Sequence, residues 1–188
     1  MNRTKRKIFE TSMELFAKKG YDATSIEEIT AVVGVAKGTL YYHFSSKEEI
    51  FNFLVEQGMR LLKTSVDIKA AKTESSIEKL KEVILIQIKI LIKYESFITI
   101  IASQMWGNEP RHIKCRENVF SYIDKIEEIV KEGQQRGELK ERDSGLIAAE
   151  IFGLLCSNLS YRLRTNEDLD IARIKKEYED IILDGLVK

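Results

Sequence analysis

The sequence contains little proline, cysteine or histidine, and each shortage excludes a class of protein. One Pro and ten Gly among 188 residues leave few chain breaks, which favours long helices over the many turns of an all-β domain. The two cysteines, Cys115 and Cys156, match neither a disulfide framework nor a metal motif. With only two histidines, His43 and His112, a structural zinc site is not expected. We therefore expect no metal and no cofactor.

Long apolar runs are also missing. The basic N-terminus is not followed by the apolar stretch of a secretory signal. The most apolar segment, residues 83–92, contains Gln87 and Lys89, which argues against a membrane span. We expect a soluble cytoplasmic protein that has no membrane partner.

Neither sign of charge predominates, because 30 Lys and Arg balance 30 Asp and Glu. The distribution is nevertheless uneven, since residues 1–47 contain eight basic and five acidic side chains. A basic N-terminal part beside a slightly acidic remainder is a weak indication of an anionic polymer as partner.

Hydrophobic spacing is helical along almost the whole chain, and no segment shows the alternation of a strand. In the N-terminal part, Gly20 ends a first helix, and a capping box formed by Ser25 and Glu28 opens a second. A three-residue turn at 34–36 separates this helix from a third, at about 37–43. Three short helices joined in this way predict a helix-turn-helix unit.

The rest of the chain continues as longer helices without an internal repeat. The fold class is therefore all-α with about nine helices, divided into a helix-turn-helix domain at 1–47 and a larger helical domain at 48–188. The further helices are expected at about 47–66 or beyond, 75–92, 96–106, 111–135, 143–164 and 168–186.

The helix at 143–164 is apolar on nearly all sides, since ten of the fourteen residues from Leu146 to Leu159 are apolar. This helix and the last one either close the core of a monomer or form a four-helix interface between two copies, and we favour the second alternative. The interface is expected to include Leu146, Ala149, Phe152, Gly153, Cys156, Ile174, Tyr178 and Ile181.

The clearest functional signal lies in the segment 35–44. On a helical wheel Leu40 and Phe44 face inward, whereas Gly38 and Tyr42 lie on the opposite side. An ordinary solvated face would carry Glu, Lys and Gln. A glycine allows the backbone to approach DNA closely, and Thr and Tyr side chains can contact phosphates, base edges and thymine methyl groups. The pattern therefore predicts a helix that enters the major groove.

Two stretches resemble the N-terminal domain of TetR/AcrR-type transcriptional regulators: GYDATSIEEI at 20–29 and AVVGVAKGTLYYHFSSKEEIF at 31–51. The resemblance is specific over about residues 5–52, and further along it is one of architecture, including the segment 132–139 ahead of the expected dimer helices. It implies a homodimeric, sequence-specific DNA-binding regulator, usually a repressor. Such a repressor leaves a palindromic operator on double-stranded DNA when a small hydrophobic effector binds within 48–188.

The resemblance also implies roles for single residues. Ala36 departs from the family pattern, in which a Ser commonly caps the recognition helix, so either another group caps this helix or its start is looser. A phosphate contact is implied for Thr24 or Ser25, contacts in the major groove for Lys37, Gly38, Thr39 and Tyr42, and contacts with the DNA backbone for Tyr41, His43 and Lys47.

An effector pocket is expected where apolar side chains surround a few polar groups. Each candidate has an ordinary explanation as well, because Met and aromatic residues at helical spacing are usually plain core. Hydrophobic drugs, fatty acids and acyl-CoA thioesters are all compatible with the resemblance, and the sequence does not choose among them. The candidates are Met59, Gln87, Leu91, Tyr94, Met105, Trp106, Asn118, Tyr122 and Phe152.

We do not expect an enzyme. His112 and Cys115 could share one side of a helix, but the sequence shows neither a third group to orient them nor an oxyanion donor. It contains no glycine-rich phosphate loop either. The alternative that stays open is a DNA-bound protein without a ligand, whose domain at 48–188 only dimerises or binds another protein.

Overall fold

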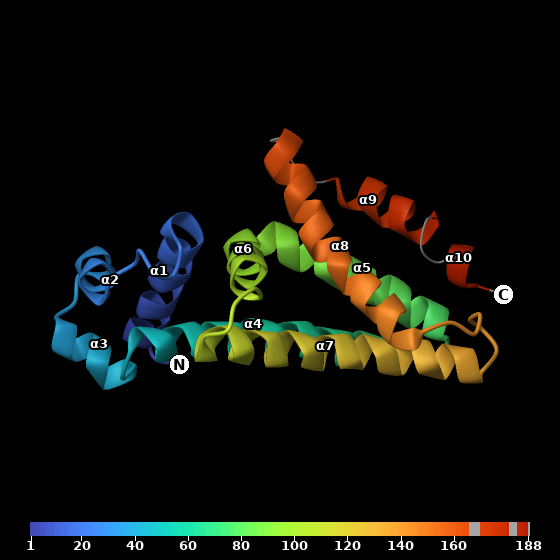
Figure 1. Ribbon diagram of the computed structural model, residues 1–188, viewed down its shortest axis with the longest axis horizontal. Coiled ribbons are helices and arrows are strands. Elements are labelled where there is room, and N and C mark those ends of the chain that lie inside the picture. The colour runs from blue at the N-terminus through green and yellow to red at the C-terminus, as the bar shows by residue number, and fades with distance from the viewer. Residues whose placement is uncertain (166–169, 181–183, 188) are drawn as a thin grey trace. The chain divides into compact units, whose positions relative to one another are not determined.

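The computed structural model describes residues 1–165, 170–180 and 184–187, and in this part of the chain it is helical without a strand (Figure 1). An isolated antiparallel bridge joins Leu139 and Val187. The predicted all-α class is confirmed. The helices are α1 (Arg3–Lys19), α2 (Ile26–Val33), α3 (Lys37–His43), α4 (Lys47–Ala70), α5 (Ser76–Lys93), α6 (Glu95–Gln104), α7 (Pro110–Gln135), α8 (Ser144–Thr165), α9 (Ile171–Tyr178) and α10 (Asp184–Leu186).

Capping residues set several helix ends where the sequence places them. Gly20 follows α1 with a φ of 87°, a conformation that glycine adopts without strain. Ser25 Oγ accepts a hydrogen bond from the Glu28 N–H at 3.1 Å, and Ser75 does the same for the Glu78 N–H at 3.5 Å. These bonds satisfy N–H groups that have no partner within the first turn of a helix.

The described residues cover only part of the last helix, predicted at 168–186. Within the described residues it is represented by α9 and α10, and Asp168 lies outside them. The N-cap of α9 is Asp170, whose Oδ1 accepts from the N–H groups of Ala172 and Arg173.

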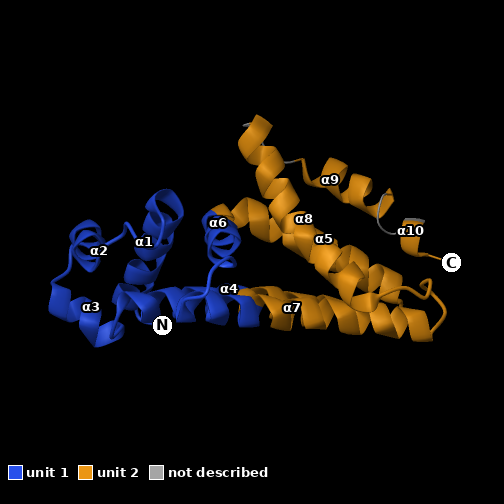
Figure 2. Ribbon diagram, in the orientation of Figure 1, with its two compact units in different colours: residues 1–58, 96–118 blue, residues 59–95, 119–188 orange. Residues whose placement is uncertain are grey.

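The chain forms two compact units (Figure 2). Unit 1 consists of residues 1–58 and 96–118, and unit 2 consists of residues 59–95 and 119–188. We expected a division after residue 47. The structure instead groups the first half of α4, α6 and the start of α7 with the three N-terminal helices, so α4 and α7 each contribute to both units.

In unit 1, α1, α2 and α3 pack on one another around Ile8, Ile29 and Leu40, one from each helix and all fully buried. A Cβ atom at Gly58 would lie 2.2 Å from the ring of Phe97. Only glycine therefore allows this α6 side chain to pack against α4.

In unit 2, α5 packs against α8 and α9. By length and composition α8 could cross a membrane, but such a helix is also expected in the core of a globular protein. Its residues Ile147, Ile151 and Leu155 are buried within the unit, which explains much of its apolar character.

Candidate functional site

The outward side of α3 is open and almost uncharged. Tyr42 is 84% exposed and Tyr41 is 45% exposed, whereas Leu40 is fully buried. A Cβ atom at Gly38 would meet no atom within 4 Å, so this glycine is not required by packing inside the chain. Another molecule can therefore approach the backbone of α3 closely at this position.

The start of α3 has no side-chain cap, because its N-cap residue is Ala36. The first residue of the helix is Lys37, and its Nζ pairs with Glu27 Oε1 of α2 at 2.5 Å. This hydrogen bond lowers the pKa of the Glu27 carboxyl and raises the pKa of the Lys37 ammonium. Both side chains are more than half exposed, so water screens the pair and an anion can take the place of Glu27.

Lys47, expected at the DNA backbone, makes its hydrogen bonds inside the protein. Its Nζ donates to the carbonyl oxygens of Tyr21 and Thr24, both at 2.8 Å, and lies 4.3 Å from the centroid of the Tyr21 ring. Thr24 is buried, and its Oγ1 donates to the carbonyl of Gly20 at 2.8 Å. The two side chains thus fix the segment of the chain that leads into α2.

Arg111, at the start of α7, binds the same segment and was missed by sequence reasoning. Its Nη2 lies 3.1 Å from Asp22 Oδ2, and its guanidinium lies 4.6 Å from the centroid of the Tyr21 ring. Its Nε donates to Gln104 Oε1 at 3.1 Å. Arg111 is only 9% exposed. A single arginine in a helix carries no local pattern that could reveal partners 89 positions away along the chain.

Three further residues expected at the DNA lie near the α3 surface in different ways. Ser25 is exposed and caps α2, as described above. Thr39 and His43 are half-buried, and the His43 ring packs edge-on against Tyr42 with 5.0 Å between centroids. Together with the exposed side chains of α3, these residues give unit 1 a polar surface over the helix-turn-helix.

The expected pocket residues are divided between the two units. Trp106 is 78% exposed, and Asn118 Nδ2 donates to the Lys114 carbonyl of its own helix at 2.9 Å. The candidates that are buried all belong to unit 2, and they are Met59, Gln87, Leu91, Tyr122 and Phe152. Unit 1 contains Met105, Trp106 and Asn118, and unit 2 contains Met59, Gln87, Leu91, Tyr94, Tyr122 and Phe152.

Three of the candidates in unit 2 are in contact. Gln87 Nε2 of α5 donates to the hydroxyl of Tyr122 of α7 at 3.3 Å, and the rings of Tyr122 and Phe152 lie 6.1 Å apart. Gln87 is 1% exposed, and no described residue forms a hydrogen bond with its Oε1. Burial raises the pKa of Tyr122, so its hydroxyl stays protonated at neutral pH. A few polar groups within an apolar interior are typical of small-molecule sites.

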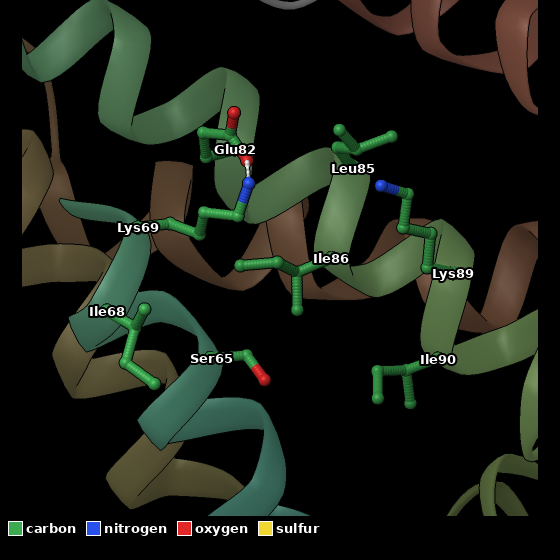
Figure 3. Close-up of a pocket in the computed structure, with 8 residues that line it drawn as sticks. All are labelled: Ser65, Ile68, Lys69, Glu82, Leu85, Ile86, Lys89 and Ile90. Carbon is green, nitrogen blue, oxygen red and sulfur yellow. Dashed lines mark ion pairs between the residues drawn. The ribbon is translucent and has the colours of Figure 1, made fainter. Parts of the chain in front are cut away.

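A cavity of about 250 Å³ lies between α4 and α5 of unit 2 (Figure 3). Its wall is mostly apolar, and at one end Lys69 Nζ lies 3.4 Å from Glu82 Oε2. None of its lining residues was predicted from the sequence, because they are ordinary members of amphipathic helices. They are Ser65, Ile68, Lys69, Glu82, Leu85, Ile86, Lys89 and Ile90.

The residues expected at a dimer interface lie mostly on α8. Leu146 is 58% exposed, Ala149 is exposed, and Gly153 and Cys156 are half-buried. At intervals of three and four residues these positions form one side of the helix. The remaining expected residues are Phe152, which is buried, Ile174 and Tyr178 of α9, which are half-buried, and Ile181, which lies outside the described residues.

The histidine and cysteine of α7 do not form a reactive pair. Burial raises the pKa of the Cys115 thiol to about 11, so it is neutral and unreactive at physiological pH. His112 Nδ1 accepts a hydrogen bond from the backbone N–H of Glu109 at 3.3 Å. Within the described part of the chain, no group of three or more His, Cys, Asp or Glu side chains could hold a metal ion.

Two family models match this chain. Residues 8–54 match the model of bacterial regulatory proteins of the tetR family, and residues 73–186 match the tetracyclin repressor-like C-terminal domain. A solved structure from Clostridium perfringens, assigned as a fatty acid metabolism regulator, is 36% identical, with a TM-score of 0.91 over 97% of this chain and 99% of its own. The fatty acid metabolism regulator protein of Bacillus subtilis is 26% identical over 183 residues, 95% of this chain and 93% of its own.

A third similar structure is the transcriptional regulator FadR from Bacillus subtilis in complex with stearoyl-CoA. It is 24% identical, with a TM-score of 0.83 over 96% of this chain and 98% of its own. At that level of identity the similarity establishes the fold.

Proposed function

The chain belongs to the TetR family of bacterial regulatory proteins and is a DNA-binding transcriptional regulator, and we propose that it is a cytoplasmic repressor released from its operator by a fatty acyl thioester. The observation that carries the regulatory part is the buried polar pair Gln87–Tyr122 inside unit 2. The names of two relatives, regulators of fatty acid metabolism, and the stearoyl-CoA bound to a third support this class of effector.

DNA is bound by the outward side of α3. Lys37, Gly38 and Tyr42 enter the major groove, with Thr39 beside them. Phosphates are contacted by Ser25, Tyr41 and His43 at its edges. Lys47 and Thr24 support this surface without contacting DNA directly, because their polar atoms hold the chain ahead of α2 in place.

A second copy of the chain covers the exposed side of α8. None of the residues of α9 is buried, and Leu146 of α8 is exposed, so both helices have apolar surface available for a partner. The resulting homodimer presents two α3 helices to successive major grooves, about 34–36 Å apart, and the operator is a near-palindrome.

Regulation requires only that the effector prefers a conformation in which the two α3 helices no longer fit successive grooves. The effector then weakens DNA binding by the same factor by which DNA weakens effector binding. Helices α4 and α7 can connect effector binding with DNA binding, since each helix contributes residues to both units.

The test is selection of binding sites from random duplex DNA by the purified protein, followed by addition of stearoyl-CoA below its micelle concentration. We expect an enriched near-palindrome, loss of binding in Tyr42→Ala, and release by stearoyl-CoA. Phe120→Ala, which changes an exposed apolar residue in unit 2 that does not line the cavity between α4 and α5, is the control and should select the same sequence and be released in the same way.

Failure at either step has a distinct meaning. A verified dimer that enriches no sequence at low salt would contradict the role of α3. Enrichment without release by any acyl thioester or fatty acid would favour the second candidate, a DNA-bound protein whose residues 48–188 serve only dimerisation or protein binding.

A further inference from the structure

Gln87 has a buried oxygen that lacks a partner. Among the described residues, five buried side-chain oxygens have no hydrogen bond, and only two of these, in Gln87 and Ser76, belong to side chains that are at least nine-tenths buried. Ser76 lies in the first turn of α5, whereas Gln87 lies in the interior of that helix and faces Tyr122. A buried acceptor without a donor destabilises the folded protein, and native proteins avoid this arrangement outside functional sites.

Tyr122 completes the set of available polar atoms. Its hydroxyl oxygen accepts the bond from Gln87 Nε2, so its own hydrogen is left to donate. Burial keeps this hydroxyl protonated, because it raises the pKa of Tyr122. The pair therefore offers one acceptor, Gln87 Oε1, and one donor, the Tyr122 O–H.

The surroundings of the pair are uncharged. Burial and the bond from Gln87 are the causes acting on the pKa of Tyr122, and no charged side chain is among them. The side chains that contact Tyr122 through its hydroxyl and its ring, Gln87 and Phe152, are both uncharged. A carboxylate bound here would be removed from water without a cation, which is strongly unfavourable.

We propose that Gln87 and Tyr122 bind the head of a fatty acyl thioester and discriminate it from the free fatty acid. The Tyr122 O–H donates to the thioester carbonyl oxygen, and Gln87 Oε1 accepts from the first amide N–H of the pantetheine arm. A free fatty acid supplies two acceptors, a negative charge and no donor at neutral pH, so it leaves Gln87 unsatisfied. This inference rests on the proposed effector class.

A purely structural role for Gln87 predicts the opposite behaviour on mutation. If Gln87 stabilised the fold, Gln87→Leu would lower the thermal midpoint. If it serves a ligand, replacing both partners in Gln87→Leu/Tyr122→Phe removes the unsatisfied oxygen and the hydroxyl together, so the midpoint stays the same or rises while thioester binding weakens.

The experiment is calorimetric titration of the full-length protein with stearoyl-CoA and with stearate, beside thermal unfolding of each variant. Gln87→Leu and the double variant Gln87→Leu/Tyr122→Phe should bind stearoyl-CoA at least tenfold more weakly, and the midpoint of the double variant should be no lower than that of the wild type. The double variant removes both polar partners together, so it covers the case in which one change alone disturbs the fold. Tyr161→Phe, an exposed tyrosine in the same unit, is the control and should bind as the wild type does.

The outcomes separate this inference from the proposed function. A wild type that binds neither ligand overturns the acyl effector and this inference together. Equal stearoyl-CoA affinity of Gln87→Leu and wild type, equal wild-type affinity for stearate and stearoyl-CoA, or a lower midpoint in both variants overturns this inference alone. Tenfold weaker binding with a retained midpoint supports it.

Discussion

Two buried polar clusters, one in each unit, differ in how completely they are hydrogen-bonded. In unit 1 the ammonium of Lys47 and the guanidinium of Arg111 both lie near the ring of Tyr21. Lys47 also donates to the carbonyl oxygens of Tyr21 and Thr24, and Arg111 pairs with the carboxylate of Asp22. In unit 2, Gln87 and Tyr122 share one bond, and Gln87 Oε1 is left without a described partner. A satisfied cluster fixes a geometry, whereas an unpaired buried polar atom is costly. The proposal above assigns a ligand to the unpaired atom of unit 2.

The surface of unit 1 also contains a residue that the contacts inside the chain do not explain. Glycine is a poor helix former, yet Gly38 occupies the first turn of α3 where a Cβ atom would have open space. No packing inside the chain explains this choice. The proposed approach of DNA to the backbone of α3 would explain it.

The largest effect is expected from loss of the satisfied cluster. Lys47→Met leaves the carbonyls of Tyr21 and Thr24 without their charged donor, which should lower the free energy of unfolding by about 1.5–3 kcal/mol. Operator affinity should fall as well, because α2 loses its support. Urea denaturation measures the first effect and fluorescence anisotropy with labelled operator the second. Lys18→Met, at an exposed lysine of α1, should change stability by less than about 0.5 kcal/mol. Equal stability of the two variants would contradict the role of Lys47.

The next effect concerns the outward side of α3. Tyr42→Ala should weaken operator binding by about tenfold or more, since a good base contact contributes about 1–3 kcal/mol. Because Tyr42 is largely exposed, the free energy of unfolding should change by less than about 0.5 kcal/mol. Anisotropy titration and urea denaturation of the same preparation check both statements. Normal operator affinity of the Tyr42→Ala variant would show that Tyr42 does not contribute to DNA binding.

A smaller effect, with opposite signs for stability and binding, is expected at Gly38. Gly38→Ala should raise the free energy of unfolding by about 0.5–1 kcal/mol, because alanine is the better helix former. Operator affinity should fall, since the added methyl group occupies the space in which DNA approaches. A stabilised variant that binds its operator normally would show that this glycine has no role in DNA binding.

The smallest effect is expected from pH. Burial, followed by the charge of Arg111, lowers the pKa of His112 from its ordinary value of 6.5. The unfolded chain therefore takes up a proton before the folded one, and stability falls as the pH drops below 6.5 toward the lowered value. His112→Gln should reduce this slope between pH 7 and 5 in thermal unfolding. An unchanged slope would assign the pH dependence to other groups.

Local chemistry explains what the sequence could predict. Gly20, Ser25 and Ser75 act on neighbouring backbone groups, so the helix ends beside them are visible in the sequence. The inward position of Leu40 and the outward position of Tyr42 follow from helical periodicity in the same way.

Contacts between distant residues explain what the sequence could not predict. The resemblance implies a contact between Lys47 and the DNA backbone, but nothing in the sequence indicates that carbonyl groups 23 and 26 positions earlier bind its ammonium. Phe97 brings α6 into unit 1 through its contact with Gly58, and neither residue belongs to a recognisable motif. The cavity between α4 and α5 depends on how two amphipathic helices pack.

The most direct measurement is the dissociation constant of stearoyl-CoA in the absence of the operator and in the presence of saturating operator. Linkage requires that the operator weakens stearoyl-CoA binding by the same factor by which stearoyl-CoA weakens operator binding. We predict equal factors, each of about five or more, which is the usual lower range of allosteric coupling. A stearoyl-CoA affinity that the operator does not change would contradict regulation by a fatty acyl thioester.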